Sequence, residues 1–425
     1  MKSKVFIFLA VAILIAACSK HEAIDSTPMV PVKSKVNNIR SYEDALKIAQ
    51  ASISMLNNSK SSTRGESNTR KIDLDNSKKV VKINAKTRSD LGINDTLIYV
   101  FNFEKNEGFV LVSASKNTEA LLAITEKGHY VPNVKTENEG FNLFIDMAKQ
   151  YIINRHTEID TTECEYVNEY IYTHNYTGPY INVKWGLTHP EGEFCPNGIS
   201  GCTITAMAQF MSYYEHPQSM QLTYPDADRS SQTFNWSLMK SHSTQHTLLE
   251  CSPNNIETHT SIGRLCRQLG YRAGSNYSDP NATSTGIYSA AFCLEYYGYQ
   301  IGWWRDYCVT EINDSLSNGK PLLISGWLND GRGHTWILDG YDEAQYWIYA
   351  YEVKADGSRI LLFTNGPYST MLYHFNWGWY GQNDGYFNSN VFATDQAIFF
   401  DTNDNSFSYN FNQRVITLSA IPNSQ

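Results

Sequence analysis

A cysteine at the start of a helix is the first residue in this sequence with clear chemical potential. In SGCTITAMAQFMSYYEHP, residues 200–217, Cys202 follows Gly201 and opens a segment with helical spacing. Unpaired N–H groups and the positive end of the helix dipole favour a thiolate there, and its own N–H can face an oxyanion. A buried structural cysteine, or a disulfide with Cys195, would give the same pattern.

A catalytic thiol needs a base, and two later segments offer one together with an orienting partner. His334 stands in GHTWILDGYD, 132 residues after Cys202 and at the start of an apolar strand. Asn376 and Trp377 follow in YHFNWGWYGQNDGYF, with Asn376 42 residues after His334. Cysteine on a helix, then histidine and asparagine on strands, is the order of papain-like proteases. We expect Asn376 to accept from the imidazole and Trp377 to shield that bond, although a lone histidine is more often structural.

The elements that must position these residues occupy the second half of the chain, 179–425. Apolar residues recur at helical spacing in the segments 202–216, 255–272 and 283–297. The segments after them read as separate strands: KPLLISGWL, GHTWILDGYD, QYWIYAYEV, LYHFNWGW, GYFNS and RVITLSAI. Helices followed by an antiparallel β half predict an α+β domain.

A smaller α+β domain is predicted for residues 41–160. Ser41 is expected to cap a helix over 41–56, and residues 140–156 read as a second helix. Between them, two apolar runs on either side of Glu-Lys-Asn-Glu-Gly predict a β-hairpin. The acidic, tyrosine-rich residues 161–178 predict a linker that contains the processing region.

The first residues predict export. MKSKVFIFLAVAILIAAC has two lysines and then an apolar run over 5–17, which is too short to span a bilayer but suits a signal peptide. Its end resembles a bacterial lipobox. Residues 1–17 are therefore predicted to be removed and Cys18 to carry lipid, followed by a tether over 18–40; a chance cysteine after an ordinary signal is the alternative. We expect a lipid anchor in the outer membrane or at the cell surface, with release after processing.

Charge and cysteine content narrow the function further. The net charge is −9 and no block of Lys and Arg occurs, which argues against nucleic-acid binding. Seven of the eight cysteines remain if Cys18 carries lipid. An odd number in an exported protein indicates one reactive thiol and room for up to three disulfides. No pair has Cys-x-x-Cys spacing, which argues against a zinc site of that type.

The segments around Cys202, His334 and Asn376 resemble the signature segments of the streptopain family, cysteine peptidases of the papain-like fold. PYINVKWG is similar to that family's lead-in to the nucleophile, FNFEKNEGFVLVSASKNTEALLAITEKG to its inhibitory propeptide and FNQRVITLSAIP to its last strand. The resemblance covers nearly all of 40–423. It implies that Cys202 is the nucleophile, that His334 is the general base and acid, and that Asn376 and Trp377 support the histidine.

The same resemblance implies partners and regulation. The substrates would be proteins or peptides with a hydrophobic side chain at the second position before the cut (P2). The chain would be made as a zymogen whose own propeptide is an intramolecular inhibitor. The resemblance implies no metal and no organic cofactor. We expect a monomer that touches the membrane through its lipid alone.

One position departs from the family's pattern. Many relatives have a glutamine shortly after the tryptophan of KWG, whose amide helps form the oxyanion hole, whereas this chain has Leu187 in KWGLTHP. Leucine has no donor, so the backbone N–H of Cys202, alone or with Thr188 or His189, would hold the oxyanion. A pseudopeptidase used for binding or inhibition is therefore one alternative. A cell-wall amidase or acyltransferase on the same fold is another.

Overall fold

The structure is a computed structural model, and its chain divides into a unit of residues 1–36 and a unit of residues 37–425. It describes residues 39–58, 70–74, 79–82, 96–156, 164–169, 175–242, 253–327, 331–354, 358–392 and 415–422. The predicted signal peptide and Cys18, the predicted site of lipidation, therefore lie outside the described residues. The fold given below is that of the second unit.

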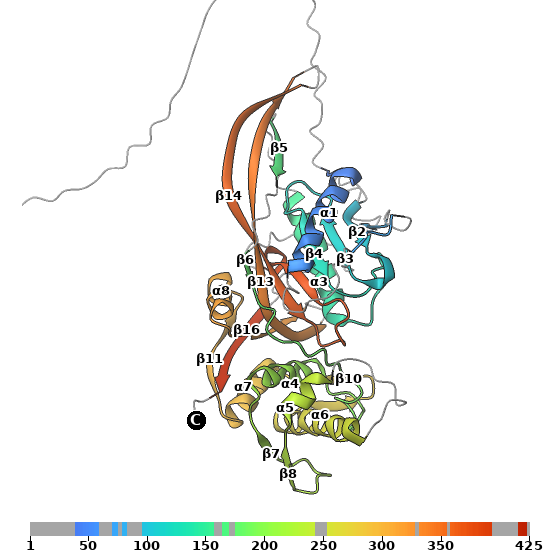
Figure 1. The fold of residues 1–425 in the computed structure, drawn as a ribbon, viewed down its shortest axis with the longest axis vertical. Coiled ribbons are helices and arrows are strands. Elements are labelled where there is room, and N and C mark those ends of the chain that lie inside the picture. Colours follow the sequence, from blue (N-terminus) through green and yellow to red (C-terminus); the bar gives the residue numbers. More distant parts are fainter. Residues whose placement is uncertain are drawn as a thin grey trace, which may run out of the picture. The chain divides into compact units, whose positions relative to one another are not determined.

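Twelve of the described strands form one antiparallel sheet, and both predicted domains contribute to it (Figure 1). Its order is β1 (Lys79–Lys82), β2 (Thr96–Asn102), β3 (Phe109–Ser113), β4 (Leu121–Thr125), β15 (Gly385–Asn388), β14 (Arg359–Asn376), β13 (Gly333–Val353), β12 (Leu322–Trp327), β16 (Val415–Pro422) and β11 (Tyr299–Asp306). β5 (Cys164–Glu169) and β6 (Asn175–Thr177) pair with β13, so residues of the predicted linker form strands. Two small ladders lie outside this sheet: β7 (Ser219–Gln221) with β8 (Ser231–Thr233), and β9 (Asn276–Asp279) with β10 (Ala282–Ser284).

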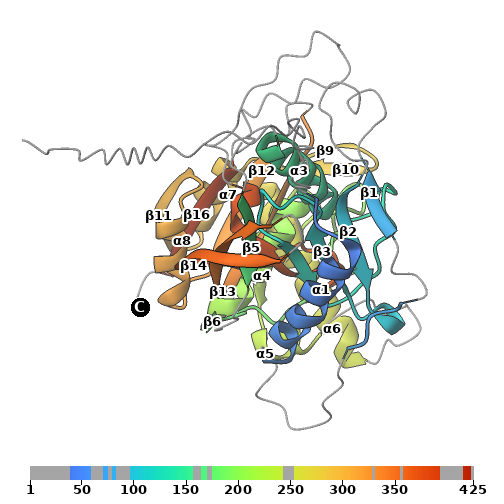
Figure 2. The same cartoon turned by 90° about the horizontal axis from the view of Figure 1, so that it is seen from above.

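The predicted helices are confirmed. They are α1 (Tyr42–Asn58), α3 (Glu139–His156), α4 (Cys202–Tyr214), α6 (Pro253–Arg272) and α7 (Ile287–Tyr296), joined by the shorter α5 (Trp236–Ser241), α8 (Val309–Ser317), η1 (Glu104–Asn106) and η3 (Ser389–Phe392). Ser41 caps α1 as expected, because its Oγ accepts the Asp44 N–H at 3.0 Å. Figure 2 shows α1 lying across β2 and β3, and Figure 1 shows α4, α5, α6 and α7 gathered in one helical part.

One strand differs from its prediction. GHTWILDGYD and QYWIYAYEV read as two strands, but they form the single strand β13 of 21 residues. β14 runs beside it from Ile337↔Asn376 to Val353↔Arg359, so the partner strand continues the ladder across the point where a break was expected. Helices and an antiparallel sheet in this arrangement confirm the predicted α+β class.

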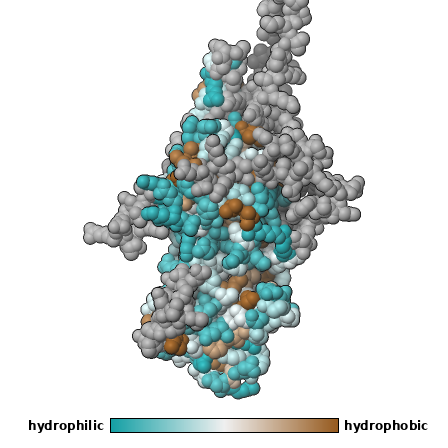
Figure 3. All heavy atoms as spheres, turned by 90° about the vertical axis from the view of Figure 1, so that its right-hand side faces the viewer, coloured by the Kyte–Doolittle hydropathy of each residue, from teal (hydrophilic) through white to brown (hydrophobic). Residues whose placement is uncertain are grey.

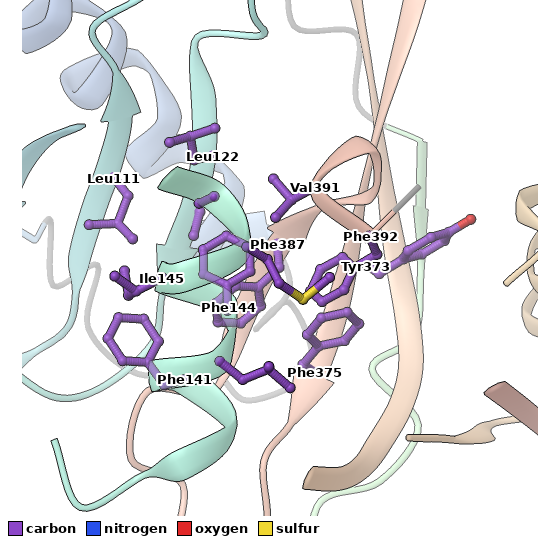
Figure 4. Close-up of a cluster of buried hydrophobic side chains, with 14 of the residues drawn as sticks. Leu111, Leu122, Phe141, Phe144, Ile145, Tyr373, Phe375, Phe387, Val391 and Phe392 are labelled. Carbon is purple, nitrogen blue, oxygen red and sulfur yellow. The ribbon is translucent and has the colours of Figure 1, made fainter. Parts of the chain in front are cut away.

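One hydrophobic core joins α3 to strands of the second predicted domain, residues 179–425 (Figure 4). The ring centroid of Phe144 on α3 lies 4.8 Å from that of Phe387 on β15 and 5.7 Å from that of Phe392. Phe141 belongs to the same buried cluster, as does Phe375 of β14. Aromatic pairs at these separations contribute beyond the area that they bury. The two predicted domains therefore share a core.

The outer surface differs from this core in the hydropathy of its residues. On the face shown in Figure 3, hydrophobic residues form small separate spots among hydrophilic ones. No helix in the described ranges is both long enough and apolar enough to cross a bilayer. The apolar side chains of this unit are concentrated in its buried clusters.

Candidate active site

Cys202 is the first residue of α4, where the sequence placed it. Gly201 before it has φ of 90°, a left-handed conformation that favours glycine, and a Cβ there would stand 2.8 Å from the Thr283 carbonyl oxygen. Every residue of α4 from Thr203 to Ser212 is buried. This packing holds the helix in place and so fixes the position of the thiol at its first residue. Cys202 is a free cysteine, so the disulfide alternative does not hold in this structure.

His334 is the second residue of β13, and its imidazole lies close enough to the Cys202 thiol for each group to shift the pKa of the other. Burial raises the pKa of that thiol, but His334, the Thr335 N–H and the Thr203 hydroxyl together bring the pKa of Cys202 below its ordinary value. Burial lowers the pKa of His334, but the Cys202 thiolate, the Trp377 carbonyl and Glu139 together raise it, so the net shift is upward. Both directions favour a thiolate beside an imidazolium, which is the reactive form of the pair.

The second ring nitrogen of His334 is held by the backbone of Trp377. Its Nε2 lies 2.9 Å from the Trp377 carbonyl oxygen. A carbonyl only accepts, so Nε2 carries the hydrogen and Nδ1 is the nitrogen left for the thiol. This hydrogen bond therefore fixes the tautomer, the role that the sequence assigned to the Asn376 side chain.

Asn376 does not make the hydrogen bond to His334 that the sequence predicted. Its Nδ2 donates to the Val183 carbonyl at 2.8 Å, and its Oδ1 accepts the Gly378 N–H at 3.1 Å. Asn376 is the last residue of β14, and the turn that follows brings the next peptide group to the imidazole instead. Asn376 thus supports the histidine indirectly, by holding the residues on either side of Trp377.

Trp377 packs beside the imidazole, but the Asn376–His334 hydrogen bond that it was predicted to shield is not made. Its side chain is fully buried, with its ring centroid 6.1 Å from that of His334, and Trp336 stacks near the same imidazole at 6.2 Å. The Trp377 N–H donates to Asp384 Oδ1 at 2.9 Å and its indole N–H to the Asn383 carbonyl at 3.1 Å. Asp384 was missed by sequence reasoning. Asp384 lies in the NDGYF segment, but nothing in the sequence indicates that its carboxylate accepts the N–H of a residue seven positions earlier.

The segment before the nucleophile is tied to neighbours away from the thiol. The Thr188 hydroxyl pairs with the Tyr380 hydroxyl at 2.7 Å, and the Thr188 N–H donates to the same oxygen at 3.0 Å. The His189 ring packs edge-on against His259, with centroids 5.0 Å apart. Neither of these contacts involves Cys202, whose own N–H lies at the helix start.

The N-terminal domain covers the histidine at Gly140. A Cβ on this second residue of α3 would stand 2.4 Å from His334 Cδ2 and 2.5 Å from Trp377 Cε3. Asn138 caps α3 with its Oδ1, and its Nδ2 donates to the Gln382 carbonyl at 3.0 Å. The backbone of the first turn of α3 therefore lies directly against the imidazole, a contact that no sequence pattern indicated.

The arrangement is suited to acyl transfer. A thiolate at a helix N-terminus can attack a carbonyl carbon, and the adjacent imidazolium can give its proton to a leaving group. The described ranges contain no group of three or more His, Cys, Asp or Glu side chains placed to hold a metal ion.

Comparisons with known proteins give the same picture. Residues 175–387 match the family model described as the Peptidase C10 family, and residues 34–152 match that of the Spi protease inhibitor. The thiol protease/hemagglutinin PrtT of Porphyromonas gingivalis is 21% identical over 336 residues, which are 70% of this chain and 34% of that protein. Streptopain of Streptococcus pyogenes is 23% identical over 335 residues, covering 68% of this chain and 73% of streptopain. The chain thus spans about a third of the length of the first relative.

A solved structure agrees on the fold. A fragment of prointerpain A from Prevotella intermedia, with a cysteine-to-alanine substitution, is 18% identical and matches with a TM-score of 0.50. The match covers 84% of this chain and 100% of the fragment. These findings confirm the predicted fold class and the resemblance to the streptopain family, and they support a cysteine-type peptidase. Half of the chain matches the family model, and the chain therefore belongs to the Peptidase C10 family.

Proposed function

We propose that this chain is an exported cysteine endopeptidase made as a zymogen. The observation that carries the proposal is the Cys202–His334 pair, in which the imidazole is buried and fixed by the Trp377 carbonyl. This geometry supplies a nucleophile and an acid in contact with each other, with the proton on a known nitrogen.

The proposed reaction cleaves a peptide bond in two steps. Cys202 Sγ attacks the carbonyl carbon, the Cys202 N–H stabilises the oxyanion, and His334 Nδ1 gives its proton to the leaving amine. A water molecule then attacks the thioester, and His334 accepts its proton. Cys202 leaves as the thiolate, and the pair returns to its starting state. Trp377 keeps Nε2–H in place through both steps.

The zymogen proposal rests on how residues 41–160 meet the catalytic domain. Gly140 lies against the imidazole, and Phe144 inserts among the aromatic rings beside it. β4 adds to the catalytic sheet by pairing with β15. A substrate that needs His334 must therefore displace α3, so this domain acts as an intramolecular inhibitor. Cleavage within 161–178 would separate it from the enzyme.

Three further parts of the proposal come from the family resemblance and from the N-terminal residues. The substrates are proteins or peptides, with a hydrophobic side chain preferred at P2. Cys18 carries lipid and anchors the chain in the outer membrane or at the cell surface until processing releases it. The matured enzyme acts as a monomer. A peptide library that varies P2 tests the first point, and mass spectrometry of the membrane fraction tests the second.

Leu187 favours one alternative, a catalytically weak pseudopeptidase that serves as a surface binding or inhibitory lipoprotein. This residue stands where many relatives have a donor, and the contacts of Thr188 and His189 lead elsewhere. Losing one oxyanion donor typically costs about 10²–10³ in turnover. Such a protein would keep the fold and the Cys202–His334 pair but hydrolyse peptides slowly.

A fluorogenic peptide assay separates these functions. The chain is expected to hydrolyse peptides after processing, and Cys202→Ala is expected to abolish both hydrolysis and self-processing. Cys308→Ala is the matched control, because Cys308 is another free, half-buried cysteine and should leave activity unchanged. Hydrolysis that survives Cys202→Ala would refute the assignment of the nucleophile. A wild-type chain without hydrolysis would favour the pseudopeptidase.

A further inference from the structure

A group of charged side chains lies beside the turn that follows β14, and the proposed mechanism does not use them. Lys184 Nζ stands 3.0 Å from Asp384 Oδ2, and His374 Nδ1 stands 2.6 Å from Asp339 Oδ1. His374 and both aspartates are fully buried. These four groups, all from the catalytic domain, carry two positive and two negative charges when His374 is protonated. Buried charges of this kind need partners to offset their desolvation.

A fifth charge comes from the other domain. Glu126, directly after β4, places Oε2 3.8 Å from Lys184 Nζ and Oε1 3.8 Å from His374 Nε2. That Nε2 has no hydrogen-bond partner among the described residues, although its ring is fully buried. A buried polar nitrogen without an acceptor is costly. The carboxylate of Glu126 therefore lies where its negative charge offsets the desolvation of the His374 ring.

The sheet fixes this carboxylate in place. Gly385 pairs with Thr125 where β4 meets β15, and the Glu126 N–H extends the ladder by donating to the Asp384 carbonyl at 2.8 Å. The backbone register thus sets Glu126 beside Asp384 and Lys184. Removal of the N-terminal domain would take away the strand and the carboxylate together.

The electrostatics agree with this geometry. Burial lowers the pKa of His374, but Asp339 and then Glu126 raise it, and the net shift is upward. Burial likewise lowers the pKa of Lys184, whereas Asp384 and Glu126 raise it above its ordinary value. Both net shifts favour the charged forms of Lys184 and His374 beside the Glu126 carboxylate.

We propose that Lys184 and His374 form a carboxylate-binding site on the catalytic domain, and that Glu126 of the propeptide occupies it. The contact holds β4 in register on β15 and so keeps α3 over His334. Asp384 belongs both to this site and to the support of Trp377. The inference rests on the proposed zymogen and names the residues by which the enzyme recognises its own inhibitor.

The test uses the full chain carrying Cys202→Ala, which is not expected to process itself. Glu126→Gln keeps the size of the side chain and removes its charge; Glu104→Gln is the matched control, because Glu104 is an exposed carboxylate of the same domain. Amide hydrogen exchange is followed in β4 and β15. Glu126→Gln should speed exchange of both strands about tenfold or more, the scale of a charge-assisted contact. Glu104→Gln should stay within about twofold of the parent.

A second variant keeps the test decisive. On a Lys184→Met background, Glu126→Gln should have a smaller effect than on the parent, because only the His374 half of the contact remains to be broken. If Lys184→Met does not fold, the comparison of Glu126→Gln with Glu104→Gln decides alone. Equal exchange in those two variants, or multiplicative effects of Glu126→Gln and Lys184→Met, would overturn the proposal. Exchange reports docking and not activity, so failure of inhibition alone would contradict the zymogen and leave this contact standing.

Discussion

Gly140→Ala is expected to displace the first turn of α3 from the catalytic histidine in the unprocessed chain. The new methyl group would stand 2.4 Å from His334 Cδ2 and 2.5 Å from Trp377 Cε3, whereas carbon atoms in contact lie about 3.5–4.0 Å apart. Both rings are buried, so α3 must withdraw by roughly 1 Å. Overpacking costs about 1–3 kcal/mol, which is roughly 5- to 150-fold in the docking equilibrium.

The assay is the rate at which iodoacetamide alkylates Cys202 in the full chain before processing. Mass spectrometry of the Cys202 peptide gives the rate, and the intact mass shows that the chain is still whole. Gly140→Ala should raise the rate by the factor above. Lys149→Ala on the same helix is the control; it removes a half-buried lysine paired with Asp146 and should leave the rate unchanged.

Two results would refute this reasoning. If Gly140→Ala is alkylated at the parent rate, the first turn of α3 does not limit access to the pair. Processing removes Gly140, so the matured enzyme should have the parent kcat/KM. A changed kcat/KM in matured Gly140→Ala enzyme would mean that the substitution acted on folding of the catalytic domain and not on its cover.

Three other substitutions test separate parts of the account. His334→Gln should lower kcat/KM by roughly 10²–10⁴-fold and raise the pKa of the Cys202 thiol, seen as a shift of its alkylation profile to higher pH. Leu187→Gln should raise kcat/KM by roughly tenfold or more, up to the 10²–10³ that one oxyanion donor supplies; no gain would mean that the hole is complete without it. Phe144→Ala should cost the full chain about 3–5 kcal/mol in urea unfolding on a Cys202→Ala background. Phe292→Ala, at an exposed ring, should stay within about 0.5 kcal/mol.

Much of the site was predictable because short patterns set it. Cys202 opens α4 because Gly201 supplies the left-handed turn and the residues after it have helical spacing. His334 enters β13 at the start of an apolar run. The order of these elements along the chain then indicated which residues would meet, and the structure brings Cys202, His334 and Trp377 together.

What the sequence did not show depends on tertiary contacts. A backbone carbonyl has no signature in the sequence, so the imidazole was assigned to the Asn376 side chain and not to the Trp377 peptide. Asp384 reaches the Trp377 N–H because the chain turns back after β14. Gly140 contacts His334, which lies 194 positions later in the sequence. The continuity of β13 follows from β14 beside it, whereas its own residues suggested two strands.

The most direct test of the central claim is the pH dependence of thiol alkylation in the matured enzyme, resolved by cysteine. His334 and its neighbours bring the pKa of Cys202 below its ordinary value despite burial, whereas burial raises the pKa of Cys195 to about 11. Iodoacetamide should therefore modify Cys202 first, with a midpoint below the value of about 8.5 for a free thiol. Modification of Cys308 or Cys195 at the same rate, or a Cys202 midpoint at or above about 8.5, would contradict the paired thiolate.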